Sequence, residues 1–214
     1  MKEVRGKIFL LLSLCLAMIL QSSFAQSKPN AQTELQSIVN KLSAAKSLTA
    51  KFSCISTDGS KSSGSIKIKD KKFAVSIANS VTIYDGKDVW QANEFSKEIN
   101  IFEPDDEMLA EINPLILIKQ GQNAFKASRL TAPDNQIKLA LTPKAGSGQD
   151  NVKRIVLTAN RSTNLPVKAE VELKSGEKLT FNFSDISLNA SVTDSSFKLD
   201  KSKYPGYQIV DLRD

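Results

Sequence analysis

Hydrophobic and polar residues alternate through the stretch from Gly64 to Glu103. Apolar side chains at every second position are typical of strands with one buried and one solvated face. The alternation covers residues 66–69, 73–77 and 81–83, and a further strand begins at Val89-Trp90. Asp85-Gly86 predicts a type I′ hairpin turn, because both central residues of that turn need positive φ. The stretch therefore predicts an antiparallel β-meander with one apolar face.

Helical patterns lie on both sides of this meander. Residues 31–46 place Leu35, Ile38, Val39 and Leu42 on one helical face. After the meander, the acidic run that follows Pro104 is typical of a helix start. Asn113-Pro114 then predicts that one short helix ends and another begins, because proline is favoured at the first helical position and disfavoured inside a helix. These segments are the candidates to cover the apolar sheet face.

Further strands are predicted before and after these helices. Alternation or β-branched residues mark residues 48–57, 137–141, 152–158, 167–173 and 179–183. The apolar and aromatic residues between Phe197 and Ile209 predict an ordered final strand in the C-terminal tail. Together the patterns predict about ten antiparallel strands and three helical pieces, with no long repeat.

The first 25 residues have the features of an export signal. Lys2, Arg5 and Lys7 precede an apolar run that is shorter than the roughly 20 residues of a membrane-spanning helix. Small residues before the end of this segment predict cleavage after Ala25. A lipid-anchored form would instead be cleaved before Cys15, but Leu14 stands where a small residue is needed. The expected mature chain is one exported domain, residues 26–214.

The composition offers little for catalysis. The chain has no histidine, which removes the commonest general base and metal ligand. Cys54 is expected to be a buried apolar residue, and Asp105 and Asp106 are explained by helix capping. The net charge of +6 is spread along the chain and indicates no nucleic-acid surface. We therefore expect no enzyme activity, no cofactor and no metal.

A family likeness is carried by segments in order rather than by one motif. They read G-S-I-K-I-K, K-F-A-V, V-T-I-Y-D-G-K-D-V-W, N-P-L-I-L-I, L-A-L-T-P-K-A and F-x-L-D. In order and spacing this set resembles the periplasmic outer-membrane lipoprotein carrier proteins, the LolA family. The resemblance implies an incomplete antiparallel β-barrel of about ten to eleven strands, covered by a lid of short helices. The implied function is to carry the acyl chains of lipoproteins from the inner to the outer membrane.

The resemblance also implies partners and a site. The partners are acylated lipoproteins, an inner-membrane ABC-type release complex and an outer-membrane receptor; no nucleic acid is implied, and a monomer is expected. An arginine that holds the lid in the family has no counterpart here, where Lys69, Asp70 and Lys71 stand. The expected lining of the apolar cavity and lid is Phe52, Phe73, Val75, Val81, Ile83, Trp90, Met108, Leu109, Ile112, Leu115 and Ile116.

Two questions stay open at the level of sequence. The same apolar residues would also form an ordinary core between a sheet and its helices, without a cavity. The same fold would also suit a non-catalytic lipid- or glycolipid-binding module, or a regulator that senses lipoproteins. The predicted location is the periplasm in each case.

Overall fold

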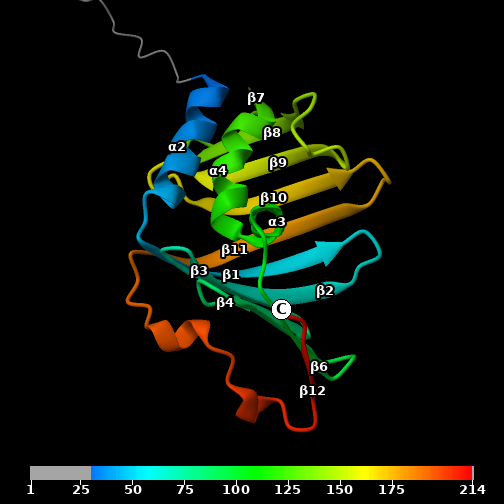
Figure 1. Cartoon of the computed structure of the whole chain (residues 1–214). Helices are drawn as coiled ribbons and strands as arrows, with labels where there is room; N and C mark the ends of the chain where they lie inside the picture. The colour runs from blue at the N-terminus through cyan, green and yellow to red at the C-terminus, as the bar shows by residue number, and fades with distance from the viewer. Residues whose placement is uncertain (1–29, 214) are drawn as a thin grey trace, which may run out of the picture.

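The computed structural model describes residues 30–213, apart from the side chains of residues 107, 110–111 and 114–117. Within this part of the chain, twelve strands form one sheet in the order β12-β6-β5-β4-β3-β2-β1-β11-β10-β9-β8-β7. The edge strands β12 and β7 do not pair with each other, so the sheet stays unclosed. Figure 1 shows α2 and α4 lying across one face of the sheet. This is the expected mainly β fold, an incomplete barrel with a helical lid.

The helices and strands have the following bounds. The helices are α2 (Ala31–Ser43), α3 (Asp106–Ile112) and α4 (Pro114–Ala124). The strands of the first half are β1 (Ser47–Ser56), β2 (Lys61–Lys69), β3 (Lys72–Ile77), β4 (Ser80–Tyr84), β5 (Val89–Asn93) and β6 (Glu98–Phe102). Those of the second half are β7 (Phe125–Arg129), β8 (Gln136–Pro143), β9 (Val152–Asn160), β10 (Pro166–Leu173), β11 (Lys178–Leu188) and β12 (Gln208–Asp211). Two 3₁₀ turns, η1 (Asp194–Phe197) and η2 (Lys201–Lys203), precede β12.

Helix α2 forms the centre of the main core. It begins at Asn30, whose side-chain oxygen accepts a hydrogen bond of 2.8 Å from the backbone N–H of Thr33. Its apolar face packs on one side of the sheet, which we call the inner face. The buried residues on that helix face are Leu35, Ile38, Val39 and Leu42. Each such fully buried side chain contributes about 1.5–3 kcal/mol, so the helix is held mainly by this contact.

The break between the second and third helices is confirmed. Asp105 caps α3, and its carboxylate accepts a 2.7 Å hydrogen bond from the backbone N–H of Met108. Asn113 then adopts an extended backbone, with φ −80° and ψ 112°. The residue before a proline is pushed into this region by the proline ring, so α4 starts afresh at Pro114.

The turn at Asp85-Gly86 differs from the prediction. Tyr84 pairs with Val89, which leaves a four-residue loop. The Asp85 carboxylate accepts hydrogen bonds of 2.9 Å from the backbone N–H groups of Lys87 and Asp88. Of the four loop residues only Gly86 has positive φ, at 105°. The predicted type I′ turn is therefore wrong, because the Asp85 side chain stabilises a longer loop instead.

The tail also differs from the predicted final strand. Only residues 208–211 form a strand, β12, and it runs parallel to β6. The segment before it makes the two 3₁₀ turns along the opposite, outer face of the sheet, shown in orange and red in Figure 1. There Leu199, Tyr204 and Tyr207 pack against a small second core formed by Ala92, Ile99 and Ile101.

Candidate ligand-binding site

The apolar residues of the meander are divided between the two sheet faces. Strands β3 and β4 are joined by a two-residue turn, so Ile77 pairs with Ser80 and Phe73 pairs with Tyr84. Odd-numbered residues of β3 therefore share a face with even-numbered residues of β4. Val81 and Ile83 consequently point to the outer face. The expectation that they share the apolar face of Phe73 is therefore wrong.

Phe73 and Val75 lie on the inner face. The side chain of Phe73 is 1% exposed, and its ring centroid lies 5.7 Å from that of Tyr84. Val75 packs against the same core, which also contains the buried side of α2. Phe73 is thus a packed core residue in this structure, and it does not face an open space.

An aromatic group continues the inner face next to this core. The rings of Phe52 on β1 and Phe181 on β11 have centroids 6.2 Å apart, and Phe183 stacks on Phe181 at 6.5 Å. Gly64 makes room for Phe52, because a Cβ at Gly64 would lie 2.4 Å from Cζ of that ring. The same Cβ would lie 2.3 Å from the carbonyl oxygen of Ser76, so a larger residue cannot be placed there.

Half-buried apolar side chains extend from this group across β9 and β10. Cys54, which is buried, pairs with Phe181, and Ala169 pairs with both Phe181 and Leu157, so all of them share the inner face. Unlike Phe73, most of these side chains are only partly covered. We call this surface the inner strip; its members are Ile155, Leu157, Ala169, Val171, Leu179, Phe181 and Phe183.

The two short helices lie beside the inner strip. Figure 1 shows α3 over β11 and α4 over β7–β10. Leu109 and Ile112 of α3, together with Ile118 of α4, pack against the main core. Met108 is 39% exposed. The break at Asn113-Pro114 lies between these two helices.

The predicted site residues therefore fall into five groups. Phe73, Val75, Leu109 and Ile112 meet in or against the main core, and Phe52 joins the inner strip. Val81, Ile83 and Trp90 lie on the outer face, Met108 is exposed, and the side chains of Leu115 and Ile116 lie outside the described residues. Phe181 and Phe183, which the structure brings to Phe52, are not among the residues expected from the sequence. Their alternation was visible, but it did not show that β11 pairs with β1.

A buried ion pair fixes α2 over the far part of the sheet. Glu34 is 4% exposed, and its Oε1 lies 2.9 Å from Arg129 and 3.1 Å from Arg161. Arg161 also donates hydrogen bonds to the carbonyl oxygens of Asp134 and Gln136. These interactions join α2 to β7 and to the ends of β8 and β9. We assign Glu34 a structural role, because both guanidinium groups hold it in place.

Cys54 is buried, as expected. Burial raises the pKa of its thiol, and the nearby charge of Glu177 raises it further. A raised pKa disfavours the reactive thiolate.

Across residues 30–213 no group of three or more His, Cys, Asp and Glu side chains is arranged to hold a metal ion. No helix in that range is long and apolar enough to cross a membrane.

Comparison with known proteins agrees with this architecture. A sequence model of the family described as outer membrane lipoprotein carrier protein LolA matches residues 43–200. The chain belongs to this family. None of the curated proteins matches it in sequence.

Comparison with solved structures gives matches at low sequence identity, of which the first shows a shared fold. An uncharacterised conserved protein from Thermus thermophilus superposes with a TM-score of 0.54 at 13% identity, over 84% of this chain and 98% of that one. A LolA superfamily protein from Nitrosomonas europaea gives 0.40 at 17%, over 80% and 99%. The MucA/MucB complex of Pseudomonas aeruginosa gives 0.40 at 14%, over 83% of this chain and 63% of that one.

The segment that stands in place of the LolA family's lid-holding arginine has another use here. Asp70 and Lys71 form the two-residue turn between β2 and β3, where Asp70 has a positive φ of 55°. Lys69 and Lys72 instead reach the outer face, where their Nζ atoms lie 3.1 and 3.5 Å from Asp194. This segment therefore holds the C-terminal tail, and among the described contacts it does not hold the helices.

Proposed function

We propose that this chain is a periplasmic carrier that binds the acyl chains of lipoproteins between the inner strip and helices α3 and α4. The observation that carries the proposal is the inner strip itself, a continuous half-buried apolar surface beside two short helices that are separated at Pro114. Membership of the lipoprotein-carrier family supports it. Of the residues expected from the sequence to line the cavity, this proposal gives a binding role to Phe52 and to Leu109 and Ile112 of α3.

An apolar surface of this kind suits an acyl chain. Each methylene group removed from water contributes about 0.8 kcal/mol, so a long chain needs no polar contact to bind. Phe73 is already fully packed, in a core that also contains the apolar face of α2. We therefore place the acyl chain along Phe181 and Phe183, where movement of α3 or α4 would expose further apolar surface.

The proposed partners follow from such a role. The carrier would take acylated lipoproteins from an inner-membrane ABC-type release complex and pass them to an outer-membrane receptor, acting as a monomer and without catalysis. Export directed by residues 1–25 would place the protein in the periplasm. This segment, which includes Cys15, lies outside the described residues.

A pair of neighbouring substitutions tests the binding surface. Phe181→Glu places a carboxylate in the inner strip, whereas Asn182→Glu places the same group on the exposed side of the same strand. We expect the first variant to bind a diacylated peptide at least about tenfold more weakly, because a carboxylate opposes an apolar ligand. The control should bind as the wild type does. Equal binding by both variants, each with a wild-type thermal transition, would contradict the proposal.

The natural ligand decides between the carrier and its rivals. Native mass spectrometry of the protein recovered from its own periplasm should show an acylated protein bound to it. Free glycolipid would instead indicate a glycolipid carrier, and an unacylated protein partner would indicate a regulator.

A further inference from the structure

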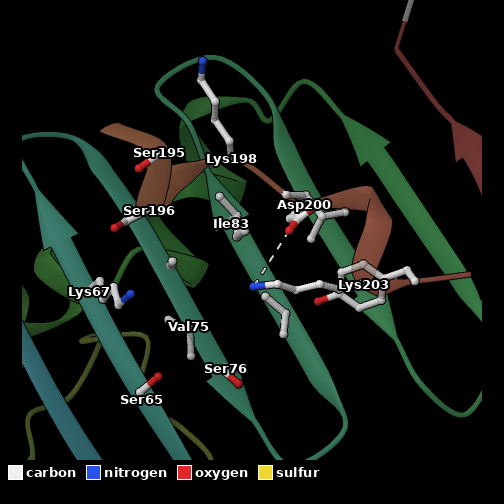
Figure 2. Close-up of a pocket in the computed structure, with 14 residues that line it drawn as sticks. Ser65, Lys67, Val75, Ser76, Ile83, Ser195, Ser196, Lys198, Asp200 and Lys203 are labelled. Carbon is white, nitrogen blue, oxygen red and sulfur yellow. Dashed lines mark ion pairs between the residues drawn. The ribbon is translucent and has the colours of Figure 1, made fainter. Parts of the chain in front are cut away.

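A pocket on the outer face is separate from the inner strip. It has a volume of about 550 Å³ and lies between strands β2–β4 and the C-terminal tail. Figure 2 shows Ile83 and Ser76 on the strands facing Ser196 and Lys203 of the tail. Acyl-chain binding at the inner face makes no use of this space.

The wall of the pocket that the tail provides is firmly anchored. Phe197, within the tail, is fully buried. Asp194 is paired with Lys69 and Lys72 at the start of the wall. At its far end, Arg213 lies 2.7 Å from the carboxylate of Asp88. A wall fixed at both ends gives the pocket a preformed shape, which lowers the entropy cost of binding a ligand.

The pocket has a surplus of positive charge. Lys67 and Lys203 line it with Asp200 as the acidic residue, and Lys198 also lines it, although Figure 2 shows the Lys198 side chain extending away from the opening. Within residues 30–213, Lys67 and Lys198 have no carboxylate at ion-pair distance, and Lys203 lies 4.0 Å from Asp200. Asp200 already accepts hydrogen bonds from the N–H and hydroxyl of Ser202. Figure 2 shows Lys67 and Lys203 reaching into the same opening from opposite sides.

Hydroxyl groups and an apolar floor complete the lining. Ser65 and Ser76 are direct neighbours across β2 and β3, and further serines come from the tail. Between these polar groups, Val81 and Ile83 form an apolar floor. Ammonium and hydroxyl groups donate hydrogen bonds, and a phosphate offers three acceptor oxygens with up to two negative charges. A carboxylate offers fewer acceptors and less charge for the same set of donors.

We propose that this outer pocket binds a phosphate ester with a small carbon group, of the glycerophosphate type. Lys67 and Lys203 hold the phosphate, the serine hydroxyls complete its hydrogen bonds, and the apolar floor receives the carbon atoms. Such an ester occurs both as a free solute and as the head group of a phospholipid. The chemistry recognised is the same in the two cases.

The test uses the full chain and two probes. One probe is glycerol 3-phosphate, measured by calorimetry and by chemical shifts at low salt. The other is a vesicle of phosphatidylcholine with or without phosphatidylglycerol. Lys67→Gln combined with Lys203→Gln should weaken binding of the phosphate about tenfold or more, because each substitution removes one charged hydrogen bond to it. Both lysines are exposed, so the double variant should still fold. Binding of diacylated peptide at the inner strip should stay unchanged.

Lys61→Gln is the matched control. Lys61 lies on the same strand and the same face as Lys67, is exposed, and lies outside the pocket. If the double variant loses binding to glycerol 3-phosphate but not to the anionic vesicles, the result supports a soluble ligand. If it loses binding to the anionic vesicles but not to glycerol 3-phosphate, the result supports a lipid head group. The proposal is overturned if neither probe binds, if the double variant binds like the wild type, or if Lys61→Gln weakens binding equally.

Discussion

The two faces of strands β3–β6 are both covered, but by segments of different character. The inner face meets α2, and its core is made almost wholly of apolar side chains such as Phe73. The outer face meets the C-terminal tail, which is held by ion pairs at Asp194 and Asp88 and by cation–π contacts of Lys201 and Arg213 with Trp90. Apolar packing dominates on the inner face, whereas on the outer face charged contacts supplement the small apolar core that holds the tail. The stability of the fold should therefore depend on the inner face, and the tail should respond to salt and pH.

The largest expected effect is at Phe73. Phe73→Ala should lower the free energy of unfolding by about 3–5 kcal/mol, because it removes a fully buried ring from a packed core. Val81→Ala, on the opposite face in the neighbouring strand, should cost only about 1 kcal/mol because Val81 is half-buried. Denaturant unfolding of both variants measures the contrast. Equal losses would mean that the two faces contribute alike.

A smaller loss is expected at Glu34. Glu34→Ala leaves Arg129 and Arg161 without their shared carboxylate and should cost about 1–3 kcal/mol, less than for a fully buried pair because both arginines are partly exposed. The exposed pair of Lys153 and Glu172 is the control, and Lys153→Ala should cost under about 1 kcal/mol. Thermal unfolding of the two variants tests this. A Glu34→Ala variant as stable as the wild type would remove the proposed anchor of α2.

The tail should loosen in acid. Hydrogen bonds from Arg213 hold the pKa of the Asp211 carboxyl at about 2, below its ordinary 3.8. The pKa of Asp211 is lower in the folded protein than in the unfolded chain. The contact between Asp211 and Arg213 is therefore fully present above about pH 4 and is lost as the pH falls toward 2. Amide exchange in β12 should therefore speed up across that window. In the Arg213→Ala variant, amide exchange in β12 should be fast at every pH in this window. If exchange in this variant still speeds up between pH 4 and 2, another group causes the change.

The smallest effect on stability is expected at Pro114. Pro114→Ala removes the residue that separates α3 from α4, so the helices should move less independently. We expect slower uptake and release of acylated peptide, with a change in stability under about 1 kcal/mol. Pro133→Ala, in the loop before β8, is the control and should leave both rates unchanged. Stopped-flow binding with a dye-labelled peptide gives the rates, and wild-type rates in Pro114→Ala would exclude a hinge there.

Sequence patterns predicted the features that depend on neighbouring residues. The apolar face of α2 and the break at Asn113-Pro114 follow from local spacing and from the geometry of proline. The faces of Val81 and Ile83 did not follow, because a turn of two residues rather than three reverses which positions share a face.

Long-range pairing was beyond the reach of these patterns. That β11 pairs with β1, which brings Phe181 to Phe52, depends on residues far apart in the chain. The parallel pairing of β12 with β6, and thus the outer pocket, likewise has no local signal. The alternation of the strands therefore indicated a sheet with apolar surface, but not which side chains would share a site.

Photo-crosslinking tests the central claim most directly. A peptide that carries a photoreactive palmitoyl chain would be bound to the protein, irradiated, and the labelled residues identified by mass spectrometry. The account predicts labels on β10 and β11, at or beside Phe181 and Phe183, and on helices α3 and α4. Labels concentrated on the outer face, at Leu199 or Tyr204, would contradict it.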